Sequence, residues 1–183
     1  MKRKLRQYVR SQRVLRSEEE LIEESERIVS ALLAHPRVVE SDSIMAFYSM
    51  PDEVCTHRLV DELVGMGKTV FLPKVVSDTE MTIHRYTSRE DIAVGAYGIM
   101  EPVTPAIELK DLPMPLVCIT PGMAFDAQCN RLGRGKGYYD RFFSAMNTLS
   151  RDVYKIGVCF SFQFVDAVPS EPTDVRMDEV INL

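Results

Sequence analysis

The chain has 183 residues, of which 45% are hydrophobic and 27% charged, a composition typical of a single globular domain. Lysines and arginines number 22 against 27 aspartates and glutamates, and the resulting net charge of −5 argues against a general nucleic-acid-binding protein. No apolar stretch approaches the roughly 18 residues that a membrane-spanning helix needs, so we expect no integral membrane helix.

The first residues of the chain are strongly basic. Residues 2–16 carry seven lysines and arginines and no acidic residue, which superficially resembles a mitochondrial transit peptide. The stretch is not rich in serine, however, and it runs directly into Ser17-Glu18-Glu19-Glu20, a capping-box pattern that opens a helix. We therefore interpret the basic stretch as part of the folded structure.

Helices and strands alternate along the rest of the chain. The capping box opens a helix that His35-Pro36 ends, and a second amphipathic helix over residues 59–64 ends at Gly65 and Gly67. Short apolar or alternating runs predict strands at residues 44–48, 70–72, 81–86, 116–120 and 154–160. Between the third and fourth strands, residues 95–115 hold four prolines and are predicted to be an irregular surface connection.

This alternation indicates βα units and a mostly parallel sheet. We expect one α/β domain over residues 1–183, with the sheet flanked by helices on both faces in a Rossmann-like three-layer arrangement. In open sheets of this kind ligands bind beyond the carboxyl ends of the strands, so the loops after Tyr48, Leu72, Thr120 and Phe160 are the expected places for chemistry.

The cysteines carry no sign of a disulfide framework or a metal site. They form no Cys-x-x-Cys pair, and two of them lie in apolar runs where a free thiol behaves as a small hydrophobic group. The four are Cys55, Cys118, Cys129 and Cys159. A reducing compartment suits them, and we expect a cytoplasmic protein.

A glycine-rich, cationic segment follows the fourth strand. Three of the nine glycines fall within residues 133–137, where Arg134 and Lys136 alternate with them and Arg131 stands just before. Each fixed glycine costs about 0.5–1 kcal/mol relative to alanine, so three together require a compensating interaction. Accessible backbone N–H groups, the cations and a helix that starts near Tyr138 all suit a phosphate ligand. The alternative is a solvated basic loop whose glycines only make an awkward turn.

The same segment predicts a metal ion and excludes two other motifs. A carboxylate such as Asp140 repels a neighbouring phosphate unless a divalent cation lies between them, which suggests Mg²⁺. The segment is not the dinucleotide fingerprint, because Tyr138 stands where that motif needs its third glycine. Gly67-Lys68-Thr69 is not a P-loop, since Glu62 occupies the place of the earlier glycine and a helix precedes it.

The run Asn130 to Asp140, NRLGRGKGYYD, closely resembles the signature of the 5-formyltetrahydrofolate cyclo-ligase family, also called methenyltetrahydrofolate synthetase. The likeness extends over nearly the whole chain. Lys2 to Arg6 resembles the family's N-terminal nucleotide-binding stretch, and Met50 to Glu53 resembles its folate-contacting loop. Tyr97 to Pro102 is similar to its central motif, and Asp174 to Val180 to its C-terminal segment.

The resemblance implies a reaction: ATP- and Mg²⁺-dependent cyclisation of 5-formyltetrahydrofolate to 5,10-methenyltetrahydrofolate, with release of ADP and phosphate. In the family the formyl oxygen attacks the γ-phosphate, and N10 of the folate closes on the resulting iminium phosphate. Such phosphoryl transfer needs positioning and charge neutralisation more than a protein nucleophile. The expected partner is the small-molecule folate substrate, with no nucleic acid and no membrane, and we expect a monomer or a weak homodimer.

The resemblance also implies roles for individual residues. Arg134 and Lys136 are the expected catalytic residues, Glu53 is expected to accept hydrogen bonds from the pterin ring, and Asp140 and Asp174 are the expected metal ligands. The predicted ATP-binding residues are Lys2, Arg3, Lys4, Leu5, Arg6, Arg131, Leu132, Gly133, Arg134, Gly135, Lys136, Gly137, Tyr138 and Tyr139. The predicted folate-binding residues are Tyr48, Glu53, Arg134, Gly135, Lys136, Gly137 and Tyr138.

The residues alone leave other interpretations open. Without the resemblance, Lys2 and Arg6 fit a solvated helix face, and Tyr48 fits the core. A sugar-phosphate isomerase or a CoA-transferase-like enzyme would also suit an α/β sheet with a phosphate loop, and neither needs ATP. A non-catalytic nucleotide-binding module would keep the loop but tolerate loss of Glu53 and Asp140. An RNA-binding module fits the acidic balance least well.

Overall fold

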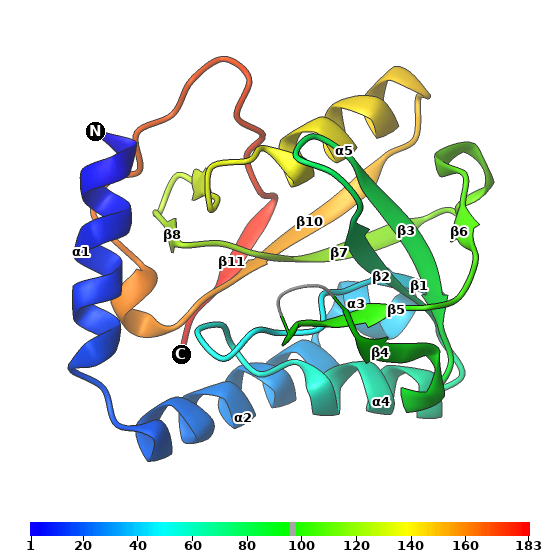
Figure 1. The fold of residues 1–183 in the computed structure, drawn as a ribbon, viewed down its shortest axis with the longest axis horizontal. Helices are drawn as coiled ribbons and strands as arrows, with labels where there is room; N and C mark the ends of the chain where they lie inside the picture. The colour runs from blue at the N-terminus through cyan, green and yellow to red at the C-terminus, as the bar shows by residue number, and fades with distance from the viewer. Residues whose placement is uncertain (96–97) are drawn as a thin grey trace.

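Seven strands form one sheet through the middle of the molecule (Figure 1). They are β1 (Ser43–Met45), β2 (Thr69–Val75), β3 (Met81–Tyr86), β6 (Ala106–Ile107), β7 (Leu116–Pro121), β10 (Val153–Val158) and β11 (Glu179–Ile181). Their order is β11-β10-β7-β1-β2-β3-β6, and all neighbours from β11 to β2 are parallel, whereas β3 is antiparallel to both β2 and β6. This computed structural model describes residues 1–95 and 98–183, so Tyr97 of the expected central motif lies outside the described residues.

Helices cover both faces of the sheet, which confirms the predicted three-layer α/β architecture (Figure 1). α2 (Glu18–Ala34), α3 (Pro36–Glu40) and α4 (His57–Gly65) pack on one face, and α5 (Tyr138–Thr148) packs on the other. Side chains alternate across a strand, so the adjacent residues Ile44 and Met45 of β1 enter opposite cores. The predicted capping box is also present, with the Ser17 hydroxyl accepting from the Glu20 backbone N–H.

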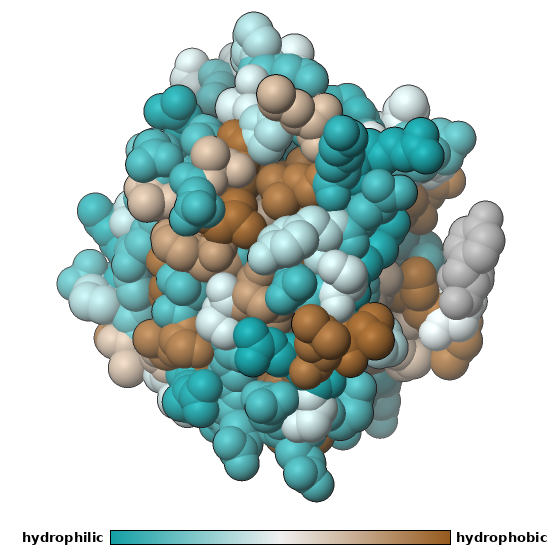
Figure 2. All heavy atoms as spheres, turned by 90° about the vertical axis from the view of Figure 1, so that its left-hand side faces the viewer, coloured by the Kyte–Doolittle hydropathy of each residue, from teal (hydrophilic) through white to brown (hydrophobic). Residues whose placement is uncertain are grey.

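The basic N-terminal stretch is helix α1 (Lys2–Val14), and it packs beside the sheet through a small apolar cluster. Val9 is 2% exposed and lies in this cluster with Leu132. Figure 2 shows the side of the molecule on which α1 lies in Figure 1. This face is mostly hydrophilic, with some hydrophobic residues among the hydrophilic ones. The interpretation of this stretch as folded structure is therefore correct. Among the described residues, no helix is both long enough and apolar enough to cross a bilayer.

Several short elements depart from the predictions. The expected irregular connection over residues 95–115 contains β6 and also β5 (Met100–Pro102), which pairs with β4 (Ile92–Val94). Strands of two or three residues are too short to leave a periodic pattern, which is why the prediction was wrong there. The first predicted strand ends three residues early, at Met45, and the chain then runs without regular structure to a turn at residues 51–53 that leads to α4. The Thr56 hydroxyl donates to the Phe47 carbonyl and so fixes this turn.

Candidate active site

The strand order changes direction at β1. The chain continues from β1 to β2 on one side of it, and the later strand β7 lies on its other side. Such a switch point opens a crevice beyond the carboxyl ends of the strands, where ligands bind in open α/β sheets. The loop after β1 (residues 46–56), the loop after β2 (residues 76–80) and the loop after β7 (residues 122–137) meet there. Arg134 joins the loops after β7 and β1 through Asp52 and Glu53, and Lys136 joins the loops after β7 and β2 through Asp78.

Residues 126–132, here called the foot of the glycine-rich segment, are fixed by a buried aspartate. Asp126 is 1% exposed. Its Oδ1 accepts from the backbone N–H groups of Gln128 and Asn130, and its Oδ2 accepts from the Asn130 side-chain amide and the Val168 backbone N–H. Burial alone would raise the pKa of Asp126, but these hydrogen bonds outweigh it and lower the pKa. The foot is thus held by the protein's own bonds.

Residues 133–137, here called the tip, have a backbone that depends on glycine. Gly135 and Gly137 have φ angles of +110° and +69°, a region that other residues rarely adopt. Gly137 is the N-cap of α5 and brings no side chain to cap its first N–H groups. Free N–H groups and the helix dipole make such an end attractive to anions. A Cβ on Gly135 would lie 3.4 Å from the Arg6 guanidinium, so this cation of α1 sits directly against the tip.

The two cations of the tip are paired with acids from the facing loops. Arg134 Nη2 lies 2.6 Å from Asp52 Oδ1 and 3.0 Å from Glu53 Oε1, and Lys136 Nζ lies 2.8 Å from Asp78 Oδ1. The hydrogen bond to Asp78 raises the pKa of Lys136. Because the Lys136 pair is well exposed to water, it is weak, and a polyanionic ligand could replace Asp78 as its partner.

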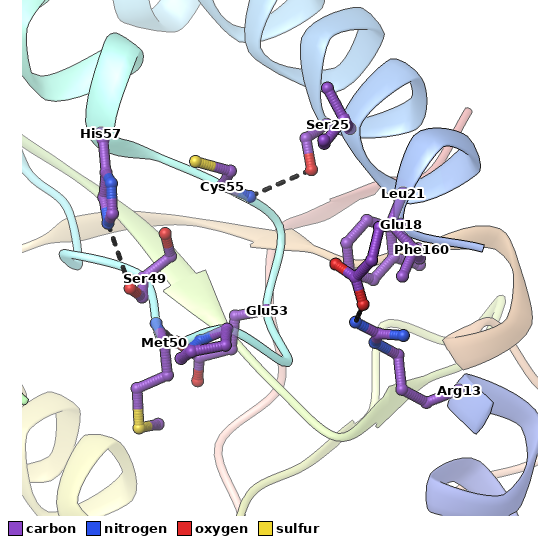
Figure 3. Close-up of a pocket in the computed structure, with 12 residues that line it drawn as sticks. Arg13, Glu18, Leu21, Ser25, Ser49, Met50, Glu53, Cys55, His57 and Phe160 are labelled. Carbon is purple, nitrogen blue, oxygen red and sulfur yellow. Dashed lines mark hydrogen bonds and ion pairs between the residues drawn. The ribbon is translucent and has the colours of Figure 1, made fainter. Parts of the chain in front are cut away.

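Among the paired acids of the site, Glu53 is the least exposed, with 10% of its side chain exposed. Burial raises its pKa, although the Met50 backbone N–H and Arg134 both favour the charged form. Glu53 and His57 line a cavity of about 180 Å³ beneath the loop after β1 (Figure 3). The Tyr48 ring stacks on the His57 ring at a centroid distance of 3.9 Å, so Tyr48 lies behind this wall of the cavity.

Helix α1 supplies two of its five predicted residues to the site. Lys2 Nζ lies 2.6 Å from Asp174 Oδ2, and Arg6 Nε donates to the Gly133 carbonyl at 2.8 Å. Leu5 packs in the apolar cluster under the helix instead. The side chains of Arg3 and Lys4 are exposed on its outer surface. The structure therefore brings Arg6 to the glycine-rich segment and Lys2 to Asp174, packs Leu5 in the cluster that includes Leu132, and leaves Arg3 and Lys4 exposed.

Around the start of α5, three further predicted residues are packed differently from one another. Arg131 is 7% exposed, and its guanidinium lies 5.4 Å from the centre of the Tyr139 ring. Burial raises the pKa of Tyr139 well above its ordinary value. Tyr138 lies at the surface instead, where its hydroxyl donates to the Ser77 carbonyl at 2.7 Å. Arg131 and Tyr139 thus support the tip from beneath, while Tyr138 ties it to the loop after β2.

The two expected metal ligands lie close to each other at the base of α5. Asp140 Oδ1 accepts from the backbone N–H of Val175, the residue next to Asp174. Asp140 pairs with Arg131 at 2.9 Å and Asp174 pairs with Lys2 at 2.6 Å. In the part of the chain that the structure describes, no three His, Cys, Asp or Glu side chains form a metal-binding group. Two carboxylates do fit Mg²⁺ sites of the kind that phosphate oxygens and water complete.

Sequence reasoning missed several residues of the site. Asp78 follows no motif, and only its position after the second predicted strand indicated that it belongs here. His57 belongs to no sequence motif, yet it lines the cavity beside Glu53. Gln163 donates to the Gly122 carbonyl at 3.0 Å and so ties the loop after β10 to the loop after β7. Its signal was its position three residues beyond Phe160, the end of the last predicted strand.

Comparison with known proteins gives one consistent result. The 5-formyltetrahydrofolate cyclo-ligase family profile matches residues 1–182. A 5-formyltetrahydrofolate cyclo-ligase of Mus musculus is 30% identical, over 98% of this chain and 92% of the relative. The NMR structure of Aquifex aeolicus 5,10-methenyltetrahydrofolate synthetase is 33% identical with a TM-score of 0.81, over 99% of this chain and 89% of that one. The corresponding synthetase of Mycoplasma pneumoniae is 26% identical with a TM-score of 0.76, over 98% and 97%.

Proposed function

The chain belongs to the 5-formyltetrahydrofolate cyclo-ligase family, and from this premise we propose that it converts 5-formyltetrahydrofolate to 5,10-methenyltetrahydrofolate with ATP and Mg²⁺, releasing ADP and phosphate. The observation that carries the proposal is the contact of Arg134 with Glu53, 3.0 Å apart across the switch point. It places a cation of a phosphate-binding loop beside a buried carboxylate suited to a pterin ring. One site can therefore hold both substrates with their reacting groups adjacent.

The ATP side of the proposal rests on the tip and on α1. The free N–H groups at the start of α5, together with Arg134, Lys136 and Arg6, provide the positive surroundings that a triphosphate needs. Lys2 lies at the other end of the same surface, next to Asp174. In the proposed complex the phosphates replace the acidic side chains as the partners of these cations.

The folate side rests on the cavity at Glu53. The ionised carboxylate accepts hydrogen bonds from the N–H groups of the pterin ring, and Tyr48 supports the stacked His57 from behind. The oxygen of the N5-formyl group then attacks the γ-phosphorus, and the bond between this phosphorus and the bridging oxygen of ADP breaks. N10 closes on the activated carbon, N10 loses its proton and phosphate leaves. Arg134 and Lys136 stabilise the charge of the transferring phosphoryl group.

Asp140 and Asp174 are the residues that would hold Mg²⁺ beside the phosphates. The ion would screen the charge of the triphosphate when bound. Arg131 pairs with Asp140 and Lys2 pairs with Asp174 in the free protein, so both carboxylates already lie against a cation. Burial would raise the pKa of Asp174, but the hydrogen bonds from Lys2 and from the Glu171 backbone N–H lower it, which favours the ionised carboxylate that a metal ligand needs.

The proposal is tested by following the near-ultraviolet absorption of the methenyl product. The purified protein is mixed with 5-formyltetrahydrofolate and Mg²⁺, with ATP, without ATP, and with ATP plus excess chelator. We expect product only in the first mixture, in a one-to-one ratio with ADP. Product formed without ATP, or ADP formed without folate consumption, would contradict the proposal. An isomerase or a CoA-transferase-like enzyme would give no ATP-dependent product at all.

A further inference from the structure

The cavity at Glu53 continues beyond the place proposed for the pterin ring. Its lining includes the polar side chains of Glu53 and His57, and the apolar Leu21 and Phe160 lie on the other side of Glu53 from His57 (Figure 3). Arg13 of α1 lies at the far end. Figure 3 shows Glu53 between His57 on one side of the cavity and Arg13 on the other.

Arg13 is incompletely satisfied where it stands. Its Nη2 pairs with Glu18 Oε1 at 2.8 Å, but its Nε is buried and has no hydrogen-bond partner among the described residues. A guanidinium offers five donors in a planar fork that matches a carboxylate. A buried donor without a partner is unfavourable, so an additional acceptor at this point would stabilise the structure.

Arg13 also stands where two cavities adjoin. A second cavity, of about 130 Å³, is lined by Arg13, by Arg10 one turn earlier in α1, and by Arg134 of the tip. The inner side of α1 therefore presents two neighbouring cations to the edge of the site. Glu18 is 78% exposed at its side chain, so it is a weak competitor for Arg13 in water.

From this arrangement we propose that Arg13 binds the glutamate carboxylate of the folate substrate and thereby determines specificity for the glutamylated form. The inference rests on the proposed function. A folate is built in a fixed order, from a hydrogen-bonding pterin through an aromatic aminobenzoyl ring to an anionic glutamate. The cavity holds a complementary group for each of these parts: Glu53 in its middle, and the apolar Phe160 and Leu21 on the side where Arg13 lies (Figure 3).

The test compares two substrates that differ only at the glutamate: 5-formyltetrahydrofolate and 5-formyltetrahydropteroate, which ends at the benzoic acid. For Arg13→Ala we expect KM for the glutamylated substrate to rise about tenfold, as loss of one charge-assisted contact does. We expect its KM for the pteroate and kcat for both substrates to stay at the wild-type values. Equal KM changes for the two substrates, or no change for either, would overturn the inference.

Two variants separate carboxylate binding from a structural role of the Arg13–Glu18 ion pair. Glu18→Gln breaks the same ion pair but keeps the cation, so we expect its KM for the glutamylated substrate to stay the same or fall. A rise matching that of Arg13→Ala in this variant would mean that only the ion pair matters, and would overturn the inference. Arg13→Lys keeps the charge and is expected to recover part of the loss.

A control and the wild-type reference complete the experiment. Arg16→Ala removes an exposed cation that lines neither cavity, and we expect it to leave both KM values unchanged. A tenfold rise in this control would assign the effect to net charge and overturn the inference. If the wild type turned over neither substrate, the proposed function would fail and this inference with it. Turnover of both substrates with equal KM in the wild type would overturn the inference alone.

Discussion

The foot (residues 126–132) and the tip (residues 133–137) of the glycine-rich segment are consecutive in sequence, yet different groups hold them. Asp126 fixes the foot with four hydrogen bonds inside the protein. The cations of the tip pair with acidic side chains of the facing loops, and Lys136 is 57% exposed in its pair with Asp78. Two arginines show the same contrast, since Arg131 is buried against Asp140 and Arg134 is half-exposed beside Asp52.

The foot therefore contributes to the free energy of folding and the tip to the free energy of ligand binding, although the two are adjacent in sequence. Bonds in the foot form when the chain folds and do not depend on a ligand. The exposed ion pair of Lys136 is weak in water, and in the proposed complex a triphosphate replaces the acidic partners of the tip with stronger charge-assisted contacts. Changes in the foot should therefore alter stability first, and changes at the tip should alter turnover first.

The largest expected effect is on the foot. Asp126→Ala leaves three backbone N–H groups and the Asn130 amide without their buried acceptor, and we expect the free energy of unfolding to fall by about 3 kcal/mol. Urea denaturation measures it. The matched control is Asp166→Ala, an exposed aspartate for which we expect a change within about 0.5 kcal/mol. A stability loss as small as that of the control would show that Asp126 does not hold the foot in place.

The opposite pattern is expected at the tip. Lys136→Ala should lower kcat about a hundredfold, as loss of a group that stabilises transition-state charge does, while its urea midpoint stays unchanged. Single-turnover measurement of ADP formation reports the effect directly. Lys110→Ala, an exposed lysine distant in sequence from the site, serves as control and should turn over normally. Normal turnover in Lys136→Ala would exclude Lys136 from the chemical step.

The same contrast explains which parts could be predicted from the sequence. The tip carries a dense pattern of glycines and cations, and the helix predicted to start at Tyr138 does so. The foot is the turn that follows β8 (Ala124–Phe125) together with β9 (Arg131–Leu132), and this hairpin is too short for any periodicity. Asp126 is bonded to Val168, far along the chain, and no local pattern encodes such a contact. Asp78 and Gln163 lie in no motif either, and only their positions after predicted strands indicated the site.

The third prediction concerns Glu53, whose pKa burial raises above its ordinary value of 4.5. As pH falls through this raised pKa the carboxylate gains a proton and loses acceptor capacity, so we expect the folate Kd to rise about tenfold. Calorimetric titration from neutral to mildly acid pH measures this change. In Glu53→Gln the Kd should be weaker throughout and independent of pH in this range. A pH-dependent Kd in that variant would assign the titration to another group.

The raised pKa of Glu53 also has a consequence for stability, with a definite sign. The folded protein holds this proton at higher pH than the unfolded chain does. The contribution of Glu53 to the free energy of unfolding therefore falls as pH rises from the ordinary value of 4.5 through the raised one. Comparing urea midpoints of the wild type and Glu53→Gln across that window isolates the contribution. We expect the difference to shift in favour of the variant as pH rises.

The smallest expected effect tests whether the acids facing the tip compete with the nucleotide. Asp78→Asn frees Lys136 from its 2.8 Å ion pair, so we expect the Kd for ATP to fall about twofold to threefold, with no change in the urea midpoint. Glu80→Gln removes one negative charge from the same loop but no ion pair recorded in the described residues, so it reports the effect of net charge alone. If both variants tightened ATP binding equally, long-range charge would explain the gain. If only Asp78→Asn did so, then Asp78 and the nucleotide compete for Lys136, and the acidic partner of the tip is displaced when ATP binds.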